Sequence, residues 1–183
     1  MEQVKETEGY EGLFHLIEQT PVIYLKAFGP ICEVGAESYS FLKSSKNIEE
    51  KGDYLFRELT GNCVGVHVRR TDHTDAIANS PLALFAERMK KELEADKETS
   101  FFVATDDKEV RRELKELLPD AKLIFPQSDV IDRDSKEGIE EAFVEMIALS
   151  KCRKILGSYN STFSLLPSYI GNIPLETVRR KKS

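Results

Sequence analysis

The sequence predicts an α/β fold, a Rossmann-like three-layer domain with a mainly parallel sheet of about five strands. Short β-branched runs alternate with longer stretches of helical period, which is typical of a parallel sheet covered by helices. The chain has 183 residues, of which 40% are hydrophobic, so it can bury one core but is short for two full α/β domains. No internal repeat or low-complexity linker divides it. We therefore expect one domain over 1–183, with 1–20 as an N-terminal extension.

Five short runs are predicted to be strands. The first is 22–28 (VIYLKAF), and the second, 63–68, consists almost entirely of small and β-branched residues. The other three follow at intervals that leave room for a helix between neighbours, at 101–105, 123–125 and 154–156. This alternation favours parallel strands joined by helical crossovers.

Helices are predicted between these strands. The segment 37–59 has a helical pattern in two pieces, which break near Ser44 and Ser45. A later helix is predicted to begin at Ser80 and Pro81, as cap and first-turn residue. Its apolar residues recur at helical spacing and form the expected buried stripe: Leu82, Phe85, Met89 and Leu93.

Two further helices follow along the chain. Asp106 with Glu109 resembles a capping box, which predicts a helix that runs to Leu118 and ends at Pro119. The polar loop 127–135 comes next and is either a lid or merely a surface loop. The last of these helices is marked by its apolar residues, Ile139, Ala142, Phe143, Met146 and Ile147.

Charge and cysteine content exclude several classes of protein. The net charge of −6 argues against a surface that follows a nucleic-acid backbone or an anionic membrane. Cys32, Cys63 and Cys152 are odd in number, far apart and without paired ligand spacing, so neither a disulfide framework nor a zinc site is indicated. The acidic N-terminus lacks an apolar signal core, and no run approaches the ~20 apolar residues of a membrane span. We expect a cytoplasmic protein.

Two arginines directly follow the second predicted strand. The strand period of two places His67 and Arg69 on the same face, with Arg70 next to them at the end of the strand. Ligands of open parallel sheets bind at the carboxyl ends of strands, and planar, permanently charged guanidiniums suit a diphosphate. The alternative is that Arg69 and Arg70 are surface residues paired to Asp72 and Asp75.

A second candidate loop follows the last predicted strand. Gly157 permits a tight turn, after which small hydroxyl and amide residues open a helix whose backbone N–H groups can hold phosphate oxygens. Asn160 or Ser161 is alternatively only an N-cap. Asp106, which ends another strand, is either a helix cap or a neighbour of the ligand. The ligand-binding candidates of the second loop are Ser158, Ser161, Thr162, Phe163 and Ser164.

Three motifs, in this order, resemble those of the fucosyltransferases. GVHVRRTD at 65–72 is similar to the first motif of the α-1,6-fucosyltransferases and of the related α-1,2- and protein O-fucosyltransferases. ATDD at 104–107 is similar to the second motif, and STFS at 161–164 to the third. The resemblance covers roughly 62–171. It implies the C-terminal, donor-binding half of a two-domain GT-B glycosyltransferase, with GDP-fucose as donor, an inverting transfer and no required metal or other cofactor.

The resemblance also implies roles for single residues. Arg69 is similar to the arginine that holds the donor β-phosphate, and Arg70 to its partner near the fucose and the leaving group, so both are the catalytic candidates. His67 is similar to the residue beside the guanine or ribose. Glu145 matches the acidic residue that reads the guanine edge, although the family has the shorter Asp; the alternative is a solvated helix face. Asp72 is expected to orient the arginines.

The family fold has its acceptor site between two domains, and 183 residues are too few for both. The chain is then a fragment, a small relative without transfer activity, or a protein whose cleft another subunit, including a second copy of itself, completes. The implied partners are a nucleotide sugar and a glycan or other hydroxyl acceptor. A GDP-sugar or anion-binding module without activity and a scaffold protein are the competing functions. Neighbouring arginines disfavour a metal hydrolase built on His67, Asp72, His73 and Asp75.

Overall fold

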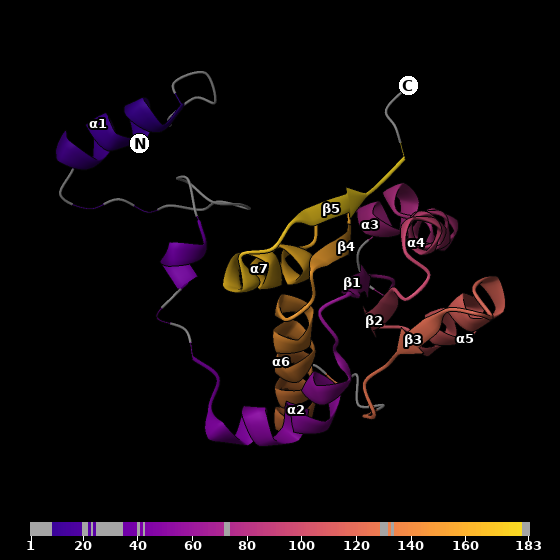
Figure 1. Ribbon diagram of the computed structural model, residues 1–183. Helices are drawn as coiled ribbons and strands as arrows, with labels where there is room; N and C mark the ends of the chain where they lie inside the picture. The colour runs from indigo at the N-terminus through magenta and orange to yellow at the C-terminus, as the bar shows by residue number, and fades with distance from the viewer. Residues whose placement is uncertain are drawn as a thin grey trace.

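The core of the protein is a five-stranded sheet with helices on both faces (Figure 1). The computed structural model describes residues 9–19, 22, 24, 35–39, 41, 43–71, 74–128, 132 and 134–180. The strands are β1 (Cys63–Val68), β2 (Ser100–Thr105), β3 (Lys122–Ile124), β4 (Lys154–Ser158) and β5 (Leu175–Val178). They lie in the order β3-β2-β1-β4-β5, and every neighbouring pair is parallel. The predicted α/β fold class with a parallel sheet is confirmed.

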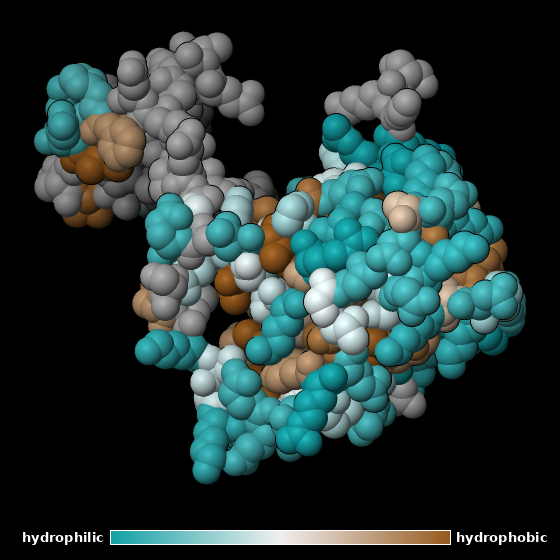
Figure 2. Space-filling model, viewed as in Figure 1, coloured by the Kyte–Doolittle hydropathy of each residue, from teal (hydrophilic) through white to brown (hydrophobic). Residues whose placement is uncertain are grey.

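The helices lie before and between these strands. They are α1 (Gly9–Gln19), the 3₁₀ helix η2 (Ala36–Tyr39), α2 (Lys46–Glu58), α3 (Thr74–Asn79), α4 (Leu82–Ala95), α5 (Lys108–Leu117), α6 (Lys136–Ser150) and α7 (Thr162–Gly171). Among the described ranges, no helix is long and apolar enough to cross a membrane. Hydrophilic side chains cover much of the surface seen in Figure 2, whereas α1 exposes apolar ones, including Phe14 at 56%.

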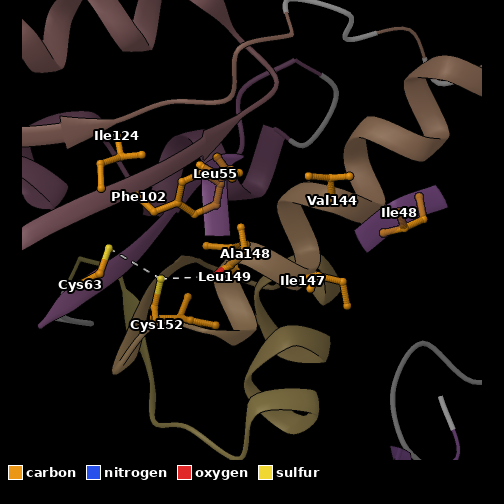
Figure 3. Close-up of a cluster of buried hydrophobic side chains, with 12 residues drawn as sticks. Ile48, Leu55, Cys63, Phe102, Ile124, Val144, Ile147, Ala148, Leu149 and Cys152 are labelled. Atoms are coloured by element: carbon orange, nitrogen blue, oxygen red, sulfur yellow. Dashed lines mark hydrogen bonds between the residues drawn. The ribbon is translucent and has the colours of Figure 1, made fainter. Parts of the chain in front are cut away.

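The side chains of β1 alternate between two apolar layers. Val64, Val66 and Val68 are fully buried on the face that α4 and α5 cover. Cys63 points to the opposite layer, where α2 and α6 pack (Figure 3). Gly65 is on this second face, and a Cβ there would lie 2.9 Å from a methyl carbon of Leu149. β1 is therefore buried on both faces, and a ligand can reach it only at the ends of the strand.

Cys63 and Cys152 meet in the layer beneath α6, although they are far apart in the sequence (Figure 3). Their Sγ atoms are 4.0 Å apart, and both are free, buried thiols. The contact with Cys63 and burial raise the pKa of the Cys152 thiol. Cys32 lies outside the described residues.

The strand predictions differ from the structure at β5. β1 to β4 lie within two residues of predicted strands, but β5 was not predicted, because LETV at 175–178 is neither an apolar run nor a clean alternation. As an edge strand, β5 is held by its pairing with β4. The predicted strand at 22–28 falls mostly outside the described residues. The two described positions, Val22 and Tyr24, are not in a strand and are 83% and 88% exposed.

The start of α5 differs from the prediction by one residue. Asp107, not Asp106, is the N-cap residue, and its side chain accepts a hydrogen bond from the Glu109 N–H at 2.9 Å. A neighbouring pair of aspartates leaves the sequence pattern ambiguous, because each can cap the same helix. The correction changes the role of Asp106, whose carboxylate has other partners at the end of β2.

The start of α4 also differs. Pro81 is the N-cap residue and Leu82 the first helical one, so Ser80 does not cap the helix as predicted. The break predicted near Ser44 and Ser45 is confirmed, since Ser45 is the N-cap residue of α2. The polar loop 127–135 lies partly outside the described residues, and its last residue caps α6 through its hydroxyl.

Candidate functional site

Three loops meet at the carboxyl edge of the sheet. They follow β2, β1 and β4, which are neighbours in the sheet. From β1 the chain continues to β2 and β3 on one side, and β4 and β5 are then added on the other side of β1. The direction of winding therefore reverses between β1 and β4. In open α/β sheets, ligands bind in the crevice at such a reversal, outside the carboxyl ends of the strands.

Asp106 anchors the loop that carries the two arginines, residues 69–71, which we call the arginine loop. One carboxylate oxygen accepts from the Arg70 N–H at 2.7 Å, and the other accepts from the Thr71 hydroxyl at 2.8 Å. Arg69 Nε lies 3.3 Å from the second oxygen, and the Asp106 side chain is 9% exposed. Asp106 is thus not the helix cap. It fixes the backbone of the arginine loop and pairs with one guanidinium.

Ser158 holds the same loop from β4. Its hydroxyl accepts from the Arg69 N–H at 2.9 Å and donates to the carbonyl of His67 at 3.1 Å. The side chain is 3% exposed. Both contacts lie within the protein, so they favour a positioning role over the direct ligand contact predicted for Ser158.

His67 is buried between β1 and α7. Its Nδ1 lies 2.7 Å from the hydroxyl oxygen of Ser164, and its ring packs against Phe163 with the ring centroids 4.8 Å apart. His67 is 3% and Ser164 1% exposed, whereas Phe163 is partly exposed. A Cβ on Gly157 would lie 2.5 Å from Ser164 Cβ, so only glycine allows this approach of β4 and α7. Of these two rings, that of Phe163 is partly exposed to solvent and the imidazole of His67 is not.

The N-terminus of α7 lies beside the arginine loop. Asn160 has a left-handed φ of 54°, which turns the chain into the helix. Ser161 is the N-cap residue but makes no capping hydrogen bond through its side chain. The amides of Thr162 and Phe163 belong to the first turn, where backbone N–H groups lack partners within the helix. Such a terminus favours an anion.

The Arg70 guanidinium is held by two backbone carbonyls. Its Nη1 donates to the carbonyls of Ser80 at 3.0 Å and Arg69 at 3.3 Å. Burial lowers the pKa of Arg70, and the carboxylates of Asp106 and Asp107 act in the opposite direction. A bound anion would offset the desolvation of this cation. Both guanidiniums are thus held by contacts within the protein, Arg69 by Asp106 and Arg70 by two carbonyls.

Glu145 is half-buried on α6 and not on a solvated helix face. Burial raises the pKa of its carboxyl to about 8; the charge of Arg111 opposes this, and Glu141 and Asp106 raise the pKa further. The influence of Asp106 places Glu145 within electrostatic range of the arginine loop. A protonated carboxyl is the form that such a site favours in the unliganded protein.

The burial of Glu145 predicts a pH-dependent stability. Below the ordinary pKa of 4.5, the carboxyl is protonated in both the folded and the unfolded chain. Between pH 4.5 and about 8, the unfolded chain releases a proton that the folded chain retains. The free energy of unfolding therefore falls as the pH rises, by up to about 1.4 kcal/mol per pH unit from this group.

Glu145→Gln removes this dependence. We expect the variant to match the wild type near pH 4 and to be more stable than it at pH 8, by on the order of 1 kcal/mol or more, in urea denaturation. Glu94→Gln, at an exposed position of α4, is the control and should leave the pH profile unchanged. Parallel profiles for wild type and Glu145→Gln would show that the carboxyl is solvated.

Two predicted residues cannot be placed. Asp72, expected to orient the arginines, and His73 lie outside the described residues. Asp75, the alternative partner of the arginines, is exposed on α3, while Asp106 pairs with Arg69. Within the described ranges, no group of three or more His, Cys, Asp or Glu side chains could hold a metal ion.

Sequence reasoning missed two residues of the site. Thr71 follows the arginines directly, and its hydroxyl donates to Asp106 at 2.8 Å; its place in the motif was the signal that could have identified it. Ser80 contacts Arg70 through its carbonyl and the loop after β4 through its hydroxyl. A serine before a proline is typical of a helix start, and this pattern concealed its other role.

Solved structures with a similar fold include fucosyltransferases. POFUT1 in complex with GDP aligns with a TM-score of 0.57 and 18% identity, over 78% of this chain and 49% of that one. POFUT1 in complex with GDP-fucose aligns with a TM-score of 0.52 and 17% identity, over 74% and 47%. A NodZ α-1,6-fucosyltransferase soaked with GDP-fucose gives 0.54 and 22%, over 92% and 59%.

The comparisons show the fold. No family model matches the sequence, and no curated protein is significantly similar to it. The predicted resemblance to fucosyltransferases is confirmed at the level of the fold, which is fucosyltransferase-like. The chain spans about half the length of these solved structures.

Proposed function

We propose that this chain is the donor-binding part of a fucosyltransferase-like glycosyltransferase, which holds GDP-fucose for inverting transfer of fucose to a hydroxyl of a glycan or another acceptor. The observation that carries the proposal is the pair Arg69 and Arg70, fixed at the reversal of the sheet beside the N-terminus of α7. Solved structures of the same fold include complexes with GDP and GDP-fucose, which supports this ligand.

The arginines would act on the leaving group. In fucosyl transfer, the bond from the anomeric carbon to the diphosphate breaks while the acceptor hydroxyl attacks from the opposite face, so negative charge grows on the β-phosphate. The guanidiniums of Arg69 and Arg70 and the first amides of α7 would stabilise this charge. Asp106 and Ser158 hold the arginine loop before the ligand arrives, so little reorganisation is needed during the reaction.

Glu145 is our candidate for reading the base. Guanine presents a ring N–H and an exocyclic amine on one edge, and a single carboxylate can accept hydrogen bonds from both. These donors favour the ionised carboxyl and so oppose the effect of burial. Adenine and uracil do not present this pair of donors, so Glu145 would make binding selective for guanine.

Nucleotide selectivity tests the proposal directly. GDP and GDP-fucose should raise the Tm of the protein more than UDP or ADP, because all four share the diphosphate and only the first two carry guanine. A ligand at 100 times its Kd adds about 2.7 kcal/mol to the free energy of unfolding. Equal shifts for the nucleotides would remove the guanine assignment. The absence of any shift at millimolar concentrations would instead favour a scaffold protein.

The same melts in EDTA test whether a cation is required. Guanidiniums rather than a metal ion meet the diphosphate in our proposal, so the shift caused by GDP should persist in the chelator. A shift that disappears in EDTA and returns with Mn²⁺ or Mg²⁺ would assign the diphosphate to a cation.

A second candidate function is a GDP-sugar-binding module without transferase activity. This function requires only a donor site, and the arginine loop held by Ser158 and Asp106 would supply it. Only the transferase would turn over GDP-fucose. Release of GDP from GDP-fucose when glycan acceptors are added supports the transferase, and binding without release supports the module. We also propose a cytoplasmic location, on the basis of the cysteine content.

A further inference from the structure

Ser80 lies in the short link between α3 and α4, and its side chain is fully buried. Its backbone N–H donates to the carbonyl of Ala76 at 2.8 Å, which closes the end of α3. Because Pro81 occupies the N-cap position of α4, the hydroxyl of Ser80 has no capping role. A buried hydroxyl requires partners, and those of Ser80 lie outside the two helices it connects.

The hydroxyl of Ser80 joins two segments from the C-terminal part of the chain. It donates to the carbonyl of Val178 at the end of β5 and accepts from the N–H of Tyr159 at 2.8 Å. Tyr159 is the first residue after β4 and leads into the turn that opens α7. A hydroxyl has one proton, so donation to Val178 leaves its lone pairs for Tyr159. The end of β5 thereby sets the orientation of the hydroxyl toward the turn.

The carbonyl of Ser80 contacts the other side of the site. It accepts from Nη1 of Arg70 at 3.0 Å. The preceding carbonyl, that of Asn79, accepts from the backbone N–H of Arg180 at 2.9 Å, which ties the link to the chain after β5. One residue therefore touches a guanidinium of the arginine loop and the turn before α7. These are the two elements that would bind the diphosphate.

We propose that Ser80 is a positioning residue of the diphosphate site. Its hydroxyl fixes the turn after β4, its carbonyl directs the Arg70 guanidinium, and β5 holds both in one geometry. The nature of the ligand rests on the proposed function. The structural part, that Ser80 fixes the two elements relative to each other, rests only on the contacts of the unliganded protein.

Ser80→Ala removes the hydroxyl and leaves the backbone carbonyl in place. GDP and GMP separate positioning from general damage, because they share the base and the α-phosphate and differ in the β-phosphate. We expect the affinity for GDP to fall about tenfold, which corresponds to the loss of one buried hydrogen bond, and the affinity for GMP to change little. Equal losses for GDP and GMP, or no loss, would overturn the proposal.

Ser150→Ala is the matched control. The Ser150 hydroxyl also donates to a backbone carbonyl, that of Ile147 at 2.7 Å, but it lies at the end of α6 before β4 begins. The ratio of the GMP and GDP dissociation constants should stay at the wild-type value in this variant. If Ser80→Ala does not fold, Ser80→Cys takes its place, because a thiol keeps a weaker donor and acceptor at the same position. For Ser80→Cys we expect a smaller fall in the ratio of the GMP dissociation constant to the GDP dissociation constant. A ratio equal to that of the wild type would overturn the proposal.

Amide hydrogen exchange of the unliganded protein tests the structural part. In Ser80→Ala the amides of Tyr159 and of 69–71 should exchange faster, while those of β2 and β3 should not change. Unchanged protection at Tyr159 would show that the hydroxyl does not hold the turn. If the wild type binds neither GDP nor GMP, the proposed function fails, and the exchange rates still decide whether Ser80 positions these loops.

Discussion

Arg69→Ala should lower the affinity for GDP by about 10- to 150-fold. The truncation leaves a charge-assisted hydrogen bond to the β-phosphate unmade, which is worth about 1.5 to 3 kcal/mol. The Tm of the unliganded protein should change little, because Asp106 keeps its hydrogen bonds to the Arg70 N–H and the Thr71 hydroxyl. Isothermal titration with GDP and thermal melts of the unliganded protein measure the two effects separately.

Lys90→Ala is the control for a change of charge alone. Lys90 is exposed on α4, on the helix that follows the Ser80 link. Its removal should change neither the GDP affinity nor the Tm. A different result for Arg69→Ala, with a lower Tm and unchanged GDP affinity, would show that the ion pair of Arg69 with Asp106 serves folding alone and would refute the assignment of the donor site.

Asp106→Ala should weaken both folding and binding. The carboxylate accepts from two backbone amides and one hydroxyl of the arginine loop and pairs with Arg69. Its loss leaves a partly buried N–H and a guanidinium without their acceptor, which we expect to lower the free energy of unfolding by about 2 to 3 kcal/mol. The GDP affinity should fall at least tenfold, because the arginines lose their fixed backbone. Urea denaturation and titration with GDP measure these effects.

Two further variants show whether Asp106 acts through its hydrogen bonds to the arginine loop or through its negative charge. Asp106→Asn retains one acceptor oxygen for the Arg70 N–H and should recover most of the lost stability. Asp107→Ala removes the neighbouring carboxylate, which caps α5, and should cost about 1 kcal/mol without changing the GDP affinity. Equal GDP affinities for Asp106→Ala and the wild type would show that the arginine loop does not need this anchor.

The sequence predicts the central part of the site because its signals are local. β1 is a fully buried strand that ends abruptly in two charges, and the structure has it at the predicted residues. Gly157 and the hydroxyl and amide residues after it predict a helix start, and α7 begins there at Thr162. In each case, residues within one turn or strand of each other determine the outcome, so pattern and spacing suffice.

The remaining features depend on contacts between distant residues. Asp106 and Asp107 are chemically equivalent as caps, and the end of β2 decides which of them faces α5 and which faces the arginine loop. The partners of the Ser80 hydroxyl are 79 and 98 residues away in the sequence, at Tyr159 and Val178. β5 has a weak local pattern and exists through its pairing with β4. None of these contacts leaves a periodic trace in the sequence.

The strand order also fixes when the arginine loop can take shape during synthesis on the ribosome. β1 is made first but lies at the centre of the sheet, and Ser158, which holds the Arg69 N–H, is made 89 residues later. Until β4 leaves the ribosome, one edge of β1 has no pairing partner, and the two guanidiniums are attached to an unfinished loop. The site therefore cannot form in the order in which its residues are made, and the arginine loop has all its contacts only after β4 has emerged.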